Sequence, residues 1–137
     1  MGLILDSSVV ISAERRAATV TDLLKQIAAV SDNQRLALSA IGLTELVHGV
    51  YRARSASSMA IREAFLSELL ATIEVYPYTR ETALLAGKID GEQRGRGVTI
   101  PLGDLLIGAT ALAAGYSILT ENVRHFRLIP GLSLLKF

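Results

Sequence analysis

Three of the thirteen carboxylates in the sequence stand out because strongly apolar residues surround them. These are Asp6, which follows a short apolar run, Glu45, which lies between leucines, and Asp104, which opens the apolar stretch 105–109. Burying a carboxylate in such surroundings is costly unless an opposite charge compensates it, and a divalent cation provides that charge. The pattern therefore indicates a metal site built from acids.

Each acid also has an ordinary structural explanation. Asp6 and Asp104 can cap the helices that follow them, and Glu45 can be a first-turn acid that the helix dipole favours. Together, however, the three lie at successive element ends of a predicted α/β sheet, where such ends converge on one edge. Like charges at that distance repel strongly without a counter-ion, which makes three independent caps the weaker interpretation.

The remaining polar residues narrow the choice of metal. The chain has no cysteine, and its two histidines, His48 and His125, lack the spacing of zinc ligands. Hard oxygen ligands favour Mg²⁺ or Mn²⁺ over zinc. Asn122 adds an amide that suits a weak metal contact, a water or a substrate phosphate. An Asx turn is the alternative role for Asn122.

The elements that must position these residues alternate between strands and helices. Short strands are predicted at 3–5, 36–39, 74–78 and 116–120, and a last apolar run covers 132–137. Helices are predicted at 9–16, 20–28, from 44–47 to about 54, and at 61–73, 80–93, 105–114 and 123–126. Such alternation implies an α/β fold with a parallel, right-handed βαβ sheet that helices cover on both faces.

Composition limits the class of protein. The length of 137 residues suits one domain, and half of the residues are hydrophobic, with a mean hydropathy of +0.40. No apolar run approaches the ~20 residues that cross a bilayer. The start of the chain does not look like a signal peptide, and the lack of cysteine favours a cytosolic protein without membrane contact. The apolar surplus is typical of a partner interface.

At this point the chain resembles the PIN-domain nucleases, and specifically the VapC-type toxins of type II toxin–antitoxin systems. The matching stretches, in the family's order, are LDSSVVI with Asp6, GLTELVHGV with Glu45, PLGDLLIGATALAAGY with Asp104 and TENVRHFRLIPGL with Asn122. The resemblance implies a single PIN domain over residues 1–137. Its expected fold has three layers, with a central parallel sheet of four to five short strands and helices on both faces.

The resemblance also assigns roles to residues. The family's metal-binding acids correspond to Asp6, Glu45 and Asp104, and Asn122 stands where many PIN nucleases carry a fourth aspartate. Ser8 and Thr120 match small hydroxyl positions that support the acidic pocket, and the neighbouring Glu121 is expected to point away. The implied catalytic set is Asp6, Glu45, Asp104 and Asn122. The implied reaction is hydrolysis of RNA phosphodiester bonds with Mg²⁺ or Mn²⁺ as cofactor.

Substrate and partners follow from the same comparison. An acidic pocket repels phosphate, so nearby cations must recruit the RNA backbone, and Arg94, Arg96 and Arg124 are the candidates. Ordinary solvated arginines are the alternative. VapC-type toxins form homodimers and larger toxin–antitoxin assemblies, and a cognate antitoxin places its tail in a groove near the acids. The helix 61–73 is a candidate for either interface.

Three rival functions stay open. A housekeeping RNA-processing or DNA flap nuclease would use the same chemistry, although such enzymes usually carry extra domains. A phospho-accepting receiver would need an aspartate after the third strand, which the segment 74–78 lacks. A non-catalytic RNA-binding PIN-like module would be expected to have lost an acid, and all three are present. The RNA that is cut, whether transfer, ribosomal or messenger, is left open.

Overall fold

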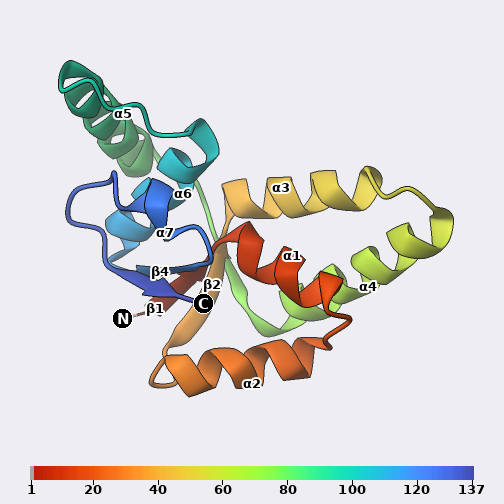
Figure 1. The fold of residues 1–137 in the computed structure, drawn as a ribbon. Helices are drawn as coiled ribbons and strands as arrows, with labels where there is room; N and C mark the ends of the chain where they lie inside the picture. The colour runs from red at the N-terminus through yellow and green to blue at the C-terminus, as the bar shows by residue number, and fades with distance from the viewer. Residues whose placement is uncertain (1) are drawn as a thin grey trace.

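A five-stranded parallel sheet forms the centre of the computed structural model, which describes residues 2–137. The strands are short and lie in the order β3-β2-β1-β4-β5. They are β1 (Gly2–Leu5), β2 (Arg35–Ser39), β3 (Glu74–Tyr76), β4 (Ser117–Thr120) and β5 (Leu134–Lys136). Helices lie on both sides of the sheet (Figure 1). The predicted three-layer α/β fold with a parallel sheet of short strands is confirmed.

Seven helices connect the strands among the described residues 2–137. They are α1 (Ser7–Arg15), α2 (Val20–Val30), α3 (Ala40–Tyr51), α4 (Ala56–Thr72), α5 (Arg80–Gly95), α6 (Leu102–Ala114) and α7 (Val123–Phe126). In Figure 1, α3 and α4 form a hairpin that extends away from the sheet. None of these helices has the length and apolar character that a membrane crossing requires.

Side-chain caps decide where several helices begin. Thr19, Ser39, Ser55 and Thr79 each accept a hydrogen bond from the backbone N–H three residues further on. Such a cap satisfies one of the N–H groups that lack a partner in the first turn of a helix. The caps at Thr19 and Thr79 come directly before α2 and α5, so both helices begin where they are predicted, at residues 20 and 80.

Several other boundaries differ from the prediction. Helix α4 begins at Ala56, before the predicted start at 61, and α3 begins at Ala40 instead of at 44–47. Helix α5 continues to Gly95, past the predicted end at 93, and the chain turns at Gly97, whose φ is +78°. Glycine tolerates this left-handed conformation without steric cost.

The order of the strands creates a switch point at β1. The chain passes from β1 to β2 and β3 on one side, and then returns to place β4 and β5 on the other side. Leu5 pairs with Leu119, so Asp6 and Thr120 are neighbours at the carboxyl ends of β1 and β4. Ligands of open α/β sheets bind outside the strands' carboxyl ends at such a switch point.

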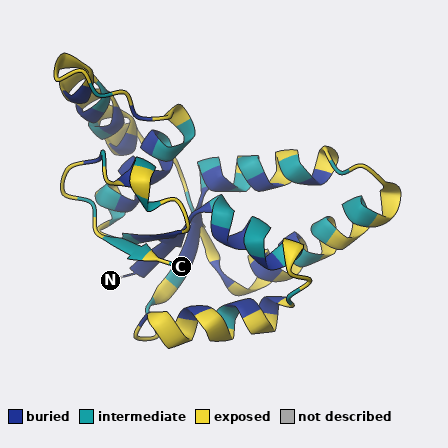
Figure 2. Ribbon diagram, viewed as in Figure 1, coloured by how far each residue is buried: buried dark blue, intermediate teal, exposed yellow. Residues whose placement is uncertain are grey.

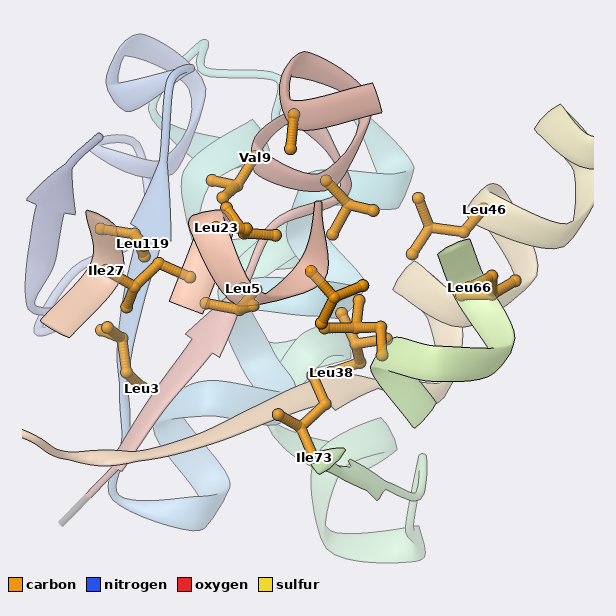
Figure 3. Close-up of a cluster of buried hydrophobic side chains, with 14 of the residues drawn as sticks. Leu3, Leu5, Val9, Leu23, Ile27, Leu38, Leu46, Leu66, Ile73 and Leu119 are labelled. Atoms are coloured by element: carbon orange, nitrogen blue, oxygen red, sulfur yellow. The ribbon is translucent and has the colours of Figure 1, made fainter. Parts of the chain in front are cut away.

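Two hydrophobic cores cover the two faces of the sheet. Leu3 and Leu5 pack with side chains of α1, α2 and α4, as Figure 3 shows, whereas Ile4 packs with α5, α6 and α7 on the opposite face. The central strands β1 and β4 and the end of β2 are consequently buried on both faces, which explains why they read as continuous apolar runs, whereas the edge strands β3 and β5 are partly exposed (Figure 2). The predicted apolar face of α4 is only partly buried, because Leu66 and Leu69 are covered while Ile61 is 69% exposed.

Gly108 allows α6 to lie tightly against the segment that follows α7. A Cβ at this position would collide with Ile129 and approach Phe126, and both of these side chains are buried. We expect Gly108→Val to lower the free energy of unfolding by about 1–3 kcal/mol, because the close packing leaves no room. Gly87 of α5 has open space around its Cα, so Gly87→Ala should instead raise it by about 0.5–1 kcal/mol. Urea unfolding of both variants measures the difference, and equal effects would contradict this account.

Candidate active site

Asp6 ends β1 and is held by hydroxyl groups from two other elements. Its Oδ2 accepts hydrogen bonds from Ser8 Oγ at 2.7 Å and from Thr120 Oγ1 at 2.8 Å, and the residue is 3% exposed. Asp6 occupies the position before α1, but its side chain makes no capping hydrogen bond. Helix capping therefore does not account for this carboxylate.

Glu45 lies in the second turn of α3, a helix that contacts both α1 and α6. Its Oε1 accepts a hydrogen bond from Ser7 Oγ of α1 at 2.8 Å. Its Oε2 lies against Gly103 in the first turn of α6, where a Cβ would stand only 2.7 Å away. Because Gly103 has no side chain, the carboxylate of Glu45 can lie directly against it and so beside Asp104, the next residue.

Asp104 lies in the first turn of α6, where a negative charge interacts favourably with the helix dipole. It is not the N-cap, because the helix already begins at Leu102. His125 Nδ1 of α7 donates to Asp104 Oδ2 at 2.8 Å. The sequence does not indicate this contact. His125 and Asp104 lie in different helices, and the spacing of the histidines bears only on zinc sites.

Asp6, Glu45 and Asp104 are here called the acidic site. The pKa values of Glu45 and Asp104 depend on burial and on the charges of neighbouring acids in this site. Burial raises the pKa of Glu45, the hydrogen bond from Ser7 lowers it, and the charges of Asp6 and Asp104 raise it further. Burial also raises the pKa of Asp104, the charge of Asp6 adds to this rise, and His125 opposes it. The fold therefore brings the three predicted acids close enough to repel one another.

The donors of the acidic site are oxygens, which a hard divalent cation prefers. Within residues 2–137, however, no three or more His, Cys, Asp or Glu side chains are arranged so that they could hold a metal ion. Mg²⁺ is usually bound through only one or two carboxylates and keeps several waters or phosphate oxygens, so it does not need three such side chains. The all-oxygen character and the mutual repulsion of the carboxylates both fit such an ion.

Asn122 follows β4 and is tied to the acidic site through the backbone. Its N–H donates to Thr120 Oγ1 at 2.8 Å, and that hydroxyl in turn donates to Asp6. The Asn122 side chain makes no capping hydrogen bond to α7. Together with Glu121 and Arg124 it lines a pocket beside the carboxyl end of β4.

The three predicted RNA-binding arginines lie in different places. Arg94 forms an ion pair with Asp90 at 3.0 Å on α5. Arg96 donates to Gln93 and lines a pocket with Leu112, close to the C-terminal end of α6 and away from Asp104. Of the three, only Arg124 lies beside Asn122. The geometry gives no support to an RNA contact by Arg94 or Arg96, and RNA binding by all three arginines stays a prediction.

The burial of Glu45, together with repulsion from the other two acids, predicts how stability depends on pH. The folded protein holds the Glu45 proton more tightly than the unfolded chain, so stability falls as pH rises from the ordinary pKa of 4.5 through the raised folded value. Glu45→Gln keeps an acceptor for Ser7 and removes the charge. In EDTA at pH 7.5 we expect its Tm to exceed that of the wild type by about 1–3 °C, a gain limited by solvent screening.

The gain should vanish at about pH 4 and below, where Glu45 is protonated in both states. Glu63→Gln, at an exposed glutamate of α4 outside the acidic site, is the matched control. Calorimetric melting at several pH values measures both variants. A gain that is the same at every pH, or that the control shares, would exclude the charge of Glu45 as its cause.

Comparison with known proteins places this geometry in a family. The PIN domain profile matches residues 3–132. Ribonuclease VapC1 of Rickettsia felis is 34% identical over 135 residues, which are 98% of this chain and 96% of that protein. The tRNA(fMet)-specific endonuclease VapC of Salmonella typhimurium is 30% identical over 104 residues, or 75% of this chain and 76% of that protein.

The fold agrees with solved structures as well. The crystal structure of VapBC2 from Rickettsia felis, bound to a DNA fragment from the promoter, contains a chain that matches with a TM-score of 0.86 at 23% identity. The match covers 100% of this chain and 99% of that chain. Profile, sequence and fold agree over nearly the whole length, and the chain therefore belongs to the PIN domain family and, within it, to the VapC proteins.

Proposed function

We propose that this chain is a metal-dependent endoribonuclease and the toxin of a toxin–antitoxin pair, with residues 1–137 acting as one PIN domain. The observation that carries the proposal is the convergence of Asp6, Glu45 and Asp104 at the switch point of the sheet. Similarity to named ribonucleases supports RNA as the substrate. The cytosolic location inferred from the sequence stays a prediction.

In this proposal Asp6, Glu45 and Asp104 hold one or two Mg²⁺ or Mn²⁺ ions. The chemistry that such an ion would supply is the activation of a water for attack on phosphorus and the stabilisation of the charge on the leaving oxygen. Ser8 and Thr120 fix Asp6 Oδ2 through their hydroxyls. The carboxylates are thereby oriented before substrate arrives, which lowers the cost of reorganisation during the reaction.

The other two carboxylates are positioned by the contacts already described. Ser7 orients Glu45 from α1, and His125 orients Asp104 from α7. Losing such an outer partner typically costs about 10- to 100-fold in metal affinity or activity. Asn122, close to Thr120, is proposed to contact the substrate phosphate or a water with its amide.

The proposed antitoxin tail lies in a groove beside Glu45. This groove has a volume of about 440 Å³ and includes Ile11, Leu46, Ile61 and Arg62 of α1, α3 and α4. Its apolar residues offer a surface for an amphipathic segment, and Ile61 is among the most exposed large apolar side chains of the described chain. A homodimer, and a larger assembly with the antitoxin, belong to the same proposal.

Cleavage of RNA by the purified protein, freed of any bound partner, tests the activity. Total RNA and purified transfer RNA are incubated with Mg²⁺, Mn²⁺ or EDTA. We expect metal-dependent cuts that Asp104→Asn slows by more than about 100-fold, because losing a ligand should exceed the 10- to 100-fold cost of losing an outer partner. Asp32→Asn, at an exposed acid in the turn before β2, should cut like the wild type.

Two results would contradict the proposal. Cleavage that persists in EDTA, or that is equal in wild type and Asp104→Asn, would come from a contaminating nuclease or from another site. A folded wild type that binds Mn²⁺ but cuts neither RNA pool would favour a non-catalytic PIN-like module. Mapping the ends of the fragments identifies which RNA is the substrate.

The hydroxyl of Thr120 gives a second test, because it reaches Asp6 from a buried position. Thr120→Val keeps the shape and removes the donor, whereas Thr120→Ser keeps the donor. We expect Thr120→Val to weaken Mn²⁺ binding and cleavage by about 10- to 100-fold, and Thr120→Ser to retain both. Isothermal titration with Mn²⁺ and the cleavage assay measure the pair, and equal behaviour would show that Thr120 does not orient Asp6.

A further inference from the structure

Three cationic side chains gather beside the acidic site without belonging to it. Arg124 of α7, Arg127 directly after α7 and Lys136 of β5 line a pocket of about 540 Å³. We call this the basic pocket. Its remaining wall consists of Glu121, Asn122, Val123 and Leu134. Three positive charges therefore face one negative charge in a hollow that is open to solvent.

These cations have no acidic partner within the described chain. The ion pairs of residues 2–137 join Lys88 to Glu92, Arg94 to Asp90, and His125 to Asp104. Arg124, Arg127 and Lys136 take part in none of them, and all three are exposed. Unlike the paired cations of α5, they are free to bind an anion.

The basic pocket is continuous with the acidic site through β4. Lys136 pairs with Thr120 in the parallel register of β5 and β4, and neighbouring strands lie roughly 4.8 Å apart. The Thr120 hydroxyl donates to Asp6, and the next residues, Glu121 and Asn122, enter the pocket wall. A chain of phosphates that passes over the carboxyl end of β4 would thus meet both surfaces in succession.

The charge balance of the whole protein gives this arrangement its importance. The formal net charge is only +1, so the protein has little general attraction for a polyanion, and the acidic site repels phosphate. Attraction must then come from a local group of cations. Arginine presents a planar fork that matches phosphate oxygens, and lysine adds a mobile point charge.

We propose that the basic pocket binds a backbone phosphate of the RNA next to the phosphate that is cut. This inference rests on the proposed ribonuclease function. Contacts to phosphate position the chain without reading its sequence. The pocket therefore sets the register and direction of the RNA strand across the acidic site. The strand enters or leaves on the β5 side, and other parts of the protein determine base preference.

Salt-dependent binding of a fluorescein-labelled single-stranded RNA tests the inference. Anisotropy is measured in EDTA on the Asp104→Asn protein, which permits binding without cleavage. Adding Arg124→Gln, Arg127→Gln and Lys136→Gln should reduce the slope of log affinity against log salt by roughly 0.7, the value for one phosphate contact on a single strand. Near 0.1 M salt this corresponds to binding that is weaker by roughly 5-fold.

The matched control removes the same charge at Lys25, Arg54 and Arg80, which are exposed and lie outside both sites. Its slope should stay within experimental error of the parent, and thermal melting confirms that both triple variants fold. Equal slopes for the two triple variants would overturn the inference and leave the ribonuclease function standing, provided that the wild type cuts RNA in parallel. A wild type that cuts no RNA would overturn both.

Discussion

Mutual repulsion among Asp6, Glu45 and Asp104 is the constraint on which the rest of the structure depends. Burial and the charge of Asp6 raise the pKa values of Glu45 and Asp104, so the charged site opposes folding and the surrounding packing must supply the energy that brings the acids together. Each acid comes from a different element and is held by a partner from yet another. The site is therefore a product of tertiary structure and is absent from any single segment of the chain.

The two hydrophobic cores on opposite faces of the sheet explain how all three acids come to lie at one site. Asp6 directly follows β1, the central strand. This is the switch point, where the chain connections go to β2 on one side of β1 and to β4 on the other. Helix α3 lies at this boundary and contacts α1 on one side and α6 on the other. Glu45 of α3 therefore lies between the two helical layers, and Asp104 belongs to α6, in the layer that packs on the Ile4 face of the sheet. A rearrangement of either core would move at least one carboxylate.

The sequence predicts the layers of this fold well, because strands buried on both faces and helices with regular spacing leave strong patterns. It also identifies the three acids, since a carboxylate among apolar residues is costly wherever it lies. Helix starts were less accurate because single caps such as Ser39 determine them. His125 and Gly103 were not identified, because their partners are distant in sequence and no local pattern records a contact between elements.

Gly103 shows that mutational tolerance in this protein does not simply follow burial. A methyl group at this position would meet only the mobile end of Glu45, so the chain can accommodate it with little loss of stability. The same methyl group would nevertheless push a carboxylate out of place. By contrast, Gly87 and Gly91 of α5 face open space and can change freely. Position 103 thus limits the placement of one charge, and a single substitution there is expected to give a folded protein whose Glu45 carboxylate is out of place.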